Sequence, residues 1–277
     1  MPLDPQFAAD AATILGHRYD LGADLWTTPD KRLIKGAPFS TLECVSYLAE
    51  LGMGSGDPVI SDAIELIFSA SLPDGRFRVY PKSTPLTCHT TNAAWTLCWA
   101  GVSGDARMQA TLNYLLESRW NDTGWRCNRS PFGKGPQCDY PNAHPTLLAL
   151  DTLRLSGYAN NDTRLDGAVR FLLDHWEVKR PIGPCRYGIG TLFMQPEYPF
   201  RSYNLFHWVY VLSFYNLARA DARFREAYQA LADKIIDGQV VVERVVPKLA
   251  KLSFCRKGEP SVLATKRWQE ITANLAA

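Results

Sequence analysis

Hydrophobic residues recur at helical spacing along most of the chain, and in one set of segments they leave a polar face. Three of these segments open with Asp-x-Arg, at Asp105, Asp162 and Asp221, and continue with apolar residues at helical intervals. A looser version begins at Asp57, a natural N-cap, with Pro58 as the first helical residue. Because each predicted helix keeps a polar face, we expect this set to form an outer layer.

A turn that contains glycine follows these helices, and a more apolar helix comes after the turn. The turns lie at 72–77, 121–125 and 237–240, where glycine supplies the left-handed residue that ends a helix. The stretch 205–212 is apolar nearly all round, which is typical of a buried helix. We therefore predict an inner layer of helices at 40–51, 90–100, 146–155, 202–218 and 260–275.

The repeating unit is thus an outer helix, a glycine turn, a loop and an inner helix. It recurs roughly every fifty to sixty residues, near the upper end of helical repeats. About four or five such hairpins can stack as a linear solenoid or close into a barrel, and the period alone does not choose between them. The 277 residues, of which 46% are hydrophobic, can fill one large core or two small ones.

Charge and hydropathy exclude several classes of partner. The formal net charge is +2 and charged residues make up 21% of the chain, so no global field attracts nucleic acid or an anionic membrane. The chain has no run of about 18 apolar residues, so no membrane span is expected. The N-terminal residues lack the basic and apolar regions of a secretory signal, so we expect a cytoplasmic protein.

Two stretches carry a resemblance to a known family. The turns at 118–125 and 72–77 are similar to the glycine-x-aromatic repeats of squalene cyclases and protein prenyltransferase β subunits. The run 124–129 and the later Cys138 also resemble a stretch of the protein farnesyltransferase β subunit that leads into its zinc motif. The resemblance implies an all-α fold, an α/α toroid of about four to five helical hairpins with inner and outer rings, as one domain over residues 1–277. It places the active site at the end of the barrel where the inner helices begin.

The sequence departs from that family at several motifs. Pro136 occupies the position of the aspartate expected two residues before the zinc cysteine, and Asp139 follows the cysteine instead. The Asp-x-Asp-Asp proton donor of squalene cyclases is absent, which argues against protonation-initiated cyclisation. The Asp-Asp-x-x-Asp magnesium motif of ionising terpene synthases is absent as well. A protein prenyltransferase also needs an α subunit, and this chain is short for its β subunit.

The seven cysteines are candidates for metal binding. Their odd number in a chain without a leader argues against a disulfide framework. Thiolates and imidazoles are preferred zinc ligands, and several fall in the loops that lead into the predicted inner helices. If the hairpins stack in register, these loops share one end of the barrel. We predict a zinc site drawn from Cys88, His89, Cys127, Cys138, His144 and Cys185.

Other interpretations of the same residue types stay open. No Cys-x-x-Cys pair occurs, and free cysteines often pack as small hydrophobes in apolar surroundings. Cys44 and Cys98 lie within apolar helices, where we expect them in the core. His175 falls on an outer polar segment and is expected to be incidental, whereas His207 lies on a helix apolar enough for a core histidine.

The same loops are basic, and the inner helices are aromatic. Arginine and lysine suit phosphate or carboxylate groups, and aromatic walls accept apolar chains. A solvated loop rim would also be basic, and an aromatic stripe is often simply core. We predict that an anionic, partly apolar small molecule is bound by Arg126, Arg129, Lys134, Arg186, Arg201, Tyr203 and His207.

These features predict a zinc-dependent enzyme on a prenyltransferase-like toroid, of the transferase or lyase type. Its substrate would be an anionic, partly apolar small molecule such as an isoprenoid diphosphate. A second hypothesis is a metal-dependent lyase or hydrolase on the same fold that does not act on isoprenoids. A third is a binding or scaffold protein whose thiols are inert. No catalytic base stands out among the residues.

Overall fold

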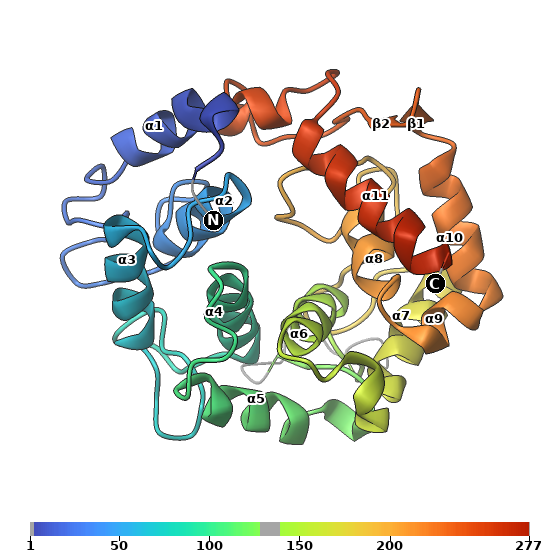
Figure 1. The fold of residues 1–277 in the computed structure, drawn as a ribbon. Helices are drawn as coiled ribbons and strands as arrows, with labels where there is room; N and C mark the ends of the chain where they lie inside the picture. The colour runs from blue at the N-terminus through green and yellow to red at the C-terminus, as the bar shows by residue number, and fades with distance from the viewer. Residues whose placement is uncertain (1–2, 128–138, 277) are drawn as a thin grey trace. The chain divides into compact units, whose positions relative to one another are not determined.

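Helices account for nearly all of the regular structure in the computed structural model, which describes residues 3–127 and 139–276 (Figure 1). The exception is a short antiparallel ribbon of β1 (Ile235–Ile236) and β2 (Gln239–Val240). The all-α prediction is therefore confirmed. The chain divides into two compact units, unit 1 (Met1–Ser118) and unit 2 (Arg119–Ala277).

Unit 1 alternates exposed and buried helices. Within it, α2 packs against α1, α3 and α4, and α4 packs against α5 (Figure 1). Two of the predicted apolar helices are present as α2 and α4, which bury most of their residues, while α3 and α5 keep the expected polar face. The helices of unit 1 are α1 (Ala8–Gly16), α2 (Thr41–Glu50), α3 (Pro58–Phe68), α4 (Thr87–Trp99) and α5 (Met108–Glu117).

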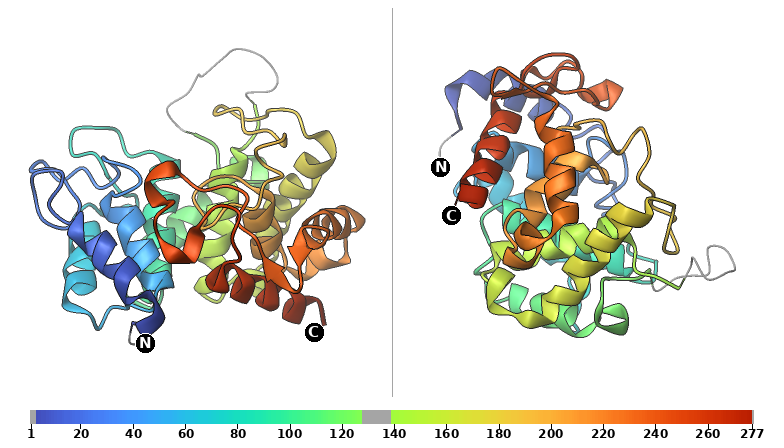
Figure 2. Two further views of the ribbon diagram at one scale, coloured as in Figure 1. Left: turned by 90° about the horizontal axis from the view of Figure 1, so that it is seen from above. Right: turned by 90° about the vertical axis from the view of Figure 1, so that its right-hand side faces the viewer.

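Unit 2 repeats the alternation around a buried helix. Every residue of α8 is buried, and α6, α10 and α11 pack against it. The connection from α7 to α8 is a long loop, coloured yellow to gold in Figure 2. The helices of unit 2 are α6 (Ala143–Leu155), α7 (Asp166–Val178), α8 (Leu205–Leu212), α9 (Asn216–Ala220), α10 (Ala222–Ala232) and α11 (Val262–Ala276).

The helix predicted at 202–218 is instead two helices, α8 and α9. Asn160 explains the break, because its side-chain amide donates to the Phe214 carbonyl (3.0 Å) and its oxygen accepts from the Asn216 N–H (2.8 Å). These bonds hold an extended residue, Tyr215, between the helices. A partner so distant in sequence leaves no mark on the local hydrophobic pattern.

Two inner helices begin earlier than predicted. Helix α4 starts at Thr87 and α6 at Ala143, so the first turns of these helices include Cys88, His89 and His144. Pro145 is compatible with the first turn of α6, because the N–H groups at a helix start have no intrahelical partner to lose. The prediction that these three side chains lie in loops before the helices is therefore wrong.

The Asp-x-Arg repeat forms a clasp at the start of the outer helices. In each copy the aspartate accepts hydrogen bonds from the backbone N–H and the guanidinium of the arginine two residues later. Two of the arginines also reach the preceding outer helix. In unit 1 Arg107 donates to Glu65 of α3 (2.8 and 2.9 Å), and in unit 2 Arg223 donates to Asp174 of α7 (2.5 Å).

A threonine hydroxyl fixes each glycine turn to the inner helix that follows. The buried amides of Phe77, Trp125 and Val240 each donate to a threonine Oγ1 at 3.0 Å. The acceptors are Thr90 of α4, Thr146 of α6 and Thr265 of α11. We call each pair a threonine clamp. At Gly124 the approach is so close that an added Cβ would clash with Thr146 Oγ1, which explains the glycine.

The predicted absence of a membrane span is consistent with the helices observed. Throughout residues 3–127 and 139–276, each helix is too short or too polar to cross a bilayer.

We expect Thr146→Val to lower the free energy of unfolding by about 1–3 kcal/mol, because it leaves the buried Trp125 N–H without an acceptor. Thr152→Val is the matched control in the same helix, since its hydroxyl donates to the Leu148 carbonyl one turn earlier in that helix. Urea denaturation followed by circular dichroism measures both. Equal loss of stability in the two variants would contradict the role of the clamp.

Candidate functional site

The start of α6 brings two predicted zinc ligands of unit 2 together. The Asn142 N–H donates to the Trp125 carbonyl (2.9 Å), and Asn142 Oδ1 accepts from the Cys185 N–H (2.9 Å). Gly183 has a φ of +74°, and an added Cβ there would clash with the Pro141 carbonyl. The segment after Trp125 and the loop at Gly183 are thereby held against the same residue.

Cys127 and Cys185 form a thiol pair at this point. The Cys127 thiol is buried and lies close to the thiol of Cys185, which is at the surface. Burial raises the pKa of Cys185, the neighbouring Cys127 raises it further, and the nearby side-chain amide of Asn142 opposes the shift. The net direction is upward, so Cys185 is a neutral thiol at neutral pH unless a cation draws its proton away.

A cluster of aromatic and imidazole rings lies beside the first turn of α6. The His144 ring centroid is 5.8 Å from that of Tyr187 and 6.3 Å from that of His207. His207 stacks on Phe200 at 4.4 Å with nearly parallel planes. We call His144, Tyr187, Phe200 and His207 the imidazole cluster. Its members come from α6, α8 and the loop between α7 and α8.

One ring nitrogen of His144 can still donate or accept a hydrogen bond. Its Nε2 is buried and makes no hydrogen bond to any described residue. Burial lowers the pKa of His144 to about 3, and the nearby His207 lowers it as well. The pKa of His207 falls to about 4, mainly through burial, although Asp151 opposes the shift. Both rings are therefore neutral at pH 7, which is the form that binds a metal or accepts a hydrogen bond.

His175 is a buried partner of the predicted residue Tyr203 and does not lie on the polar face of its helix. Its Nε2 lies 3.2 Å from the Arg180 carbonyl, which can only accept, so the proton is on Nε2. Nδ1 must then accept from the Tyr203 hydroxyl at 2.9 Å. His175 follows Phe171 and Leu172 at helical spacing on the inner face of α7, and that spacing was the signal in the sequence.

The predicted basic residues do not form one group. Arg126 lies over the Trp120 ring at 4.3 Å and pairs with Asp139 at 3.3 Å, so it is already engaged. Arg186 is exposed and forms no ion pair with a described residue, and Arg201 is half-buried next to Phe200. The other residues predicted to act in this region, Arg129, Lys134 and Cys138, lie outside the described residues.

Cys88 and His89 belong to unit 1 and not to the thiol pair of unit 2. Both are half-buried in the first turn of α4, where His89 meets the Tyr80 ring edge-on at 5.8 Å. Over the part of the chain that the structure describes, no three Cys, His, Asp or Glu side chains gather closely enough to hold a metal. The zinc site stays a prediction.

A buried charged network, which the sequence analysis missed, shares the helix faces of the imidazole cluster. Asp151 is fully buried and accepts from Arg154 Nε (2.6 Å), and Arg154 donates to the Tyr210 hydroxyl (3.2 Å). Tyr210 donates to Glu270 Oε2 (2.7 Å), whose other oxygen pairs with Arg267 (2.7 Å). Charged side chains inside α6, a helix otherwise read as apolar, were the available signal.

No family model matches this sequence, and no curated protein does. The functional assignment therefore depends on the chemistry of these residues.

The buried histidines predict a loss of stability in mild acid. The pKa of His175 is about 4 in the folded protein, against about 6.5 when unfolded, so the unfolded chain binds more protons between these values. The protonation of His175 therefore leaves the free energy of unfolding unchanged above about pH 6.5 and lowers it as the pH falls toward 4. We expect His175→Gln to reduce this fall by roughly 2–3 kcal/mol.

Urea denaturation at several pH values measures this effect. Tyr203→Phe is the control, because it removes the hydrogen bond but keeps the imidazole. It should lower stability at pH 7 and retain the fall in acid. A His175→Gln profile parallel to that of the wild type would contradict the assignment of a neutral, buried imidazole.

Proposed function

We propose that the protein is a zinc-dependent enzyme whose reactive centre lies at the start of α6, and that it acts on an anionic, partly apolar small molecule. The observation that carries the proposal is that the thiols of Cys127 and Cys185 are close neighbours beside the imidazole cluster. The segments that carry the two cysteines are distant in sequence, and Asn142 hydrogen-bonds with both of them. These bonds hold the two thiols in fixed positions.

The donor set fits zinc in part. Two thiolates favour zinc over magnesium or calcium, which prefer oxygen ligands. A catalytic zinc site takes about three ligands from the protein, and the described residues supply the pair Cys127 and Cys185. When bound, zinc would keep these thiols deprotonated and act as a Lewis acid toward a substrate atom or water.

The surrounding residues suit substrate binding. The unpartnered Nε2 of His144 can bind a substrate hydroxyl or carbonyl group, depending on which ring nitrogen carries the proton. Tyr187 and Phe200 offer aromatic surface to an apolar portion. Arg186 directly follows Cys185 and is exposed, so its guanidinium is available to a phosphate or carboxylate.

The α/α toroid belongs to the same proposal. Alternating outer and inner helices within each unit support it, as do the glycine turns that resemble those of squalene cyclases and prenyltransferases. In this arrangement residues 1–277 would be one domain, and an isoprenoid diphosphate would be a natural substrate. The lyase or hydrolase alternative uses the same thiol pair with a different substrate.

A binding protein without chemistry is the second candidate, and the histidine pKa values favour it. His144, His175 and His207 have pKa values of about 3 to 4, so they are weak bases at neutral pH. Such rings serve as hydrogen-bonding groups more readily than as proton acceptors. In this case the thiol pair would hold no metal.

Elemental analysis of protein purified without a histidine tag distinguishes the two candidates. We expect about one zinc per chain in the wild type and less than about 0.1 in Cys127→Ala and in Cys185→Ala, because each loses a thiolate. Cys44→Ala is the matched control, since Cys44 is a fully buried core thiol in unit 1. Circular dichroism verifies that each variant folds.

Two outcomes would contradict the zinc proposal. The first is wild-type protein that contains no zinc in repeated preparations, which would favour the binding role. The second is full zinc content in both Cys127→Ala and Cys185→Ala, which would place the metal elsewhere.

A further inference from the structure

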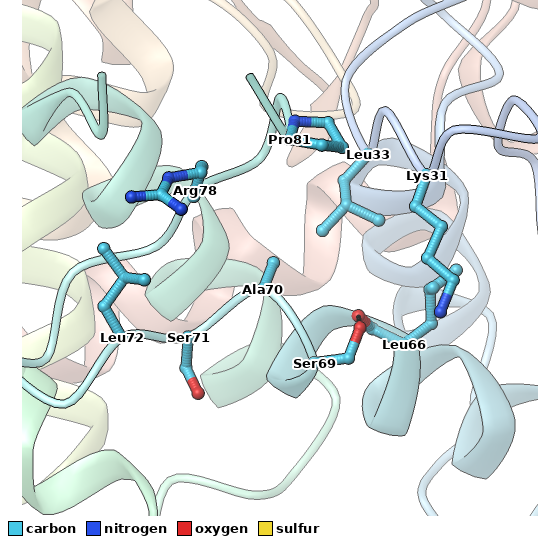
Figure 3. Close-up of a pocket in the computed structure, with 9 residues that line it drawn as sticks. All are labelled: Lys31, Leu33, Leu66, Ser69, Ala70, Ser71, Leu72, Arg78 and Pro81. Carbon is cyan, nitrogen blue, oxygen red and sulfur yellow. Dashed lines mark hydrogen bonds between the residues drawn. The ribbon is translucent and has the colours of Figure 1, made fainter. Parts of the chain in front are cut away.

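Unit 1 contains a cavity of about 290 Å³ that none of the features above explains (Figure 3). It is lined by the end of α3, the turn that follows it, and two loop segments near residues 31–33 and 78–81. The polar side chains in its wall are Lys31, Arg78, Ser69 and Ser71, and the rest are apolar. Two cations and no carboxylate are among the residues that line this space.

Arg78 differs from the other arginines of unit 1. Each of the others pairs with an aspartate or glutamate, namely Arg18, Arg32, Arg76 and Arg107. Arg78 has no ion pair within the described ranges, and neither has Lys31 across the cavity (Figure 3). An unpaired arginine and lysine around one cavity leave two positive charges for an external anion.

The C-terminal end of α3, which lies beside the cavity, does not present a strong negative charge that would repel a bound anion. The last carbonyls of α3 already accept hydrogen bonds from within the chain. Ser69 donates its N–H to Glu65 and its hydroxyl to Leu66 (2.9 and 2.6 Å). Ala70 and Ser71 donate to the next two carbonyls, at 3.0 and 2.9 Å. These donors offset the partial negative charge of the helix C-terminus.

The segments that carry the two cations are held together before any ligand arrives. The Leu33 N–H donates to the Val79 carbonyl (3.0 Å), and the Arg78 N–H donates to the Ala70 carbonyl (2.8 Å). Lys31 has a φ of +58°, a left-handed conformation fixed by its N–H bond to the Thr28 carbonyl (2.7 Å). A rigid frame with two unpaired cations lowers the entropic cost of binding an anion.

We propose that this cavity binds a small molecule that carries a phosphate or carboxylate group, with Arg78 on one side of the cavity and Lys31 on the other supplying the positive charge (Figure 3). The apolar wall, which includes Leu33, Leu66 and Leu72, takes a short apolar body attached to that group. The volume is near the lower limit for ligand sites, which suits a compact monoester or acid. The site lies entirely in unit 1 and requires no metal, so it does not rest on the proposed zinc function.

Isothermal titration calorimetry with butyl phosphate and with butanoate tests the proposal. The full chain is used in the presence of a chelator, so that the presence or absence of zinc has no influence. We expect saturable binding of at least one probe, weakened roughly tenfold or more by Arg78→Ala and by Lys31→Ala. Lys35→Ala is the matched control, because Lys35 is an exposed lysine in the same segment that does not line the cavity.

The probes distinguish the two sources of the anion. Tighter binding of butyl phosphate indicates a phosphate ester, tighter binding of butanoate indicates a carboxylic acid, and either result supports the site. No saturable binding of either probe to the wild type would overturn the proposal. Binding that Arg78→Ala and Lys31→Ala leave unchanged would overturn it as well.

Discussion

The hydrogen bond from a turn amide to a buried threonine hydroxyl determines where the inner helices lie. A buried N–H without an acceptor is costly, so each turn must meet its helix at one residue. The clamp between Trp125 and Thr146 has a direct effect on the candidate site. Cys127 lies two residues after one partner and His144 two residues before the other, so the same bond positions a thiol and an imidazole.

Asn142 extends this constraint to a third segment. It occupies the N-cap position of α6, and it hydrogen-bonds with the backbone of Trp125 and of Cys185. The dithiol therefore follows from the need to satisfy backbone polar groups around one helix end. The same burial makes His144 neutral and leaves its Nε2 without a described partner. The chemistry of the site and the packing of its helices have one physical origin.

The sequence predicts local features well and distant contacts poorly. The Asp-x-Arg starts and the glycine turns depend on neighbouring residues and appear at the expected places, whereas α4 and α6 begin three residues before the predicted start. The break at Tyr215 depends on Asn160, and the network of Asp151 and Arg154 is completed by Glu270, far along the chain. The thiol pair of Cys127 and Cys185 joins residues from different hairpins, so hairpin periodicity suggested only that their loops would be near each other.

The ion pair between Arg107 and Glu65 influences which outer helices pack side by side. The side chain of Arg107 is 45% exposed and that of Glu65 is 61% exposed, so solvent and salt screen their attraction. Such a pair adds little to the strength of packing. It does favour one particular helix beside another, because a like charge at the same place would repel. In each unit the apolar faces hold the helices together, and the surface arginines favour the correct helix beside each of their own.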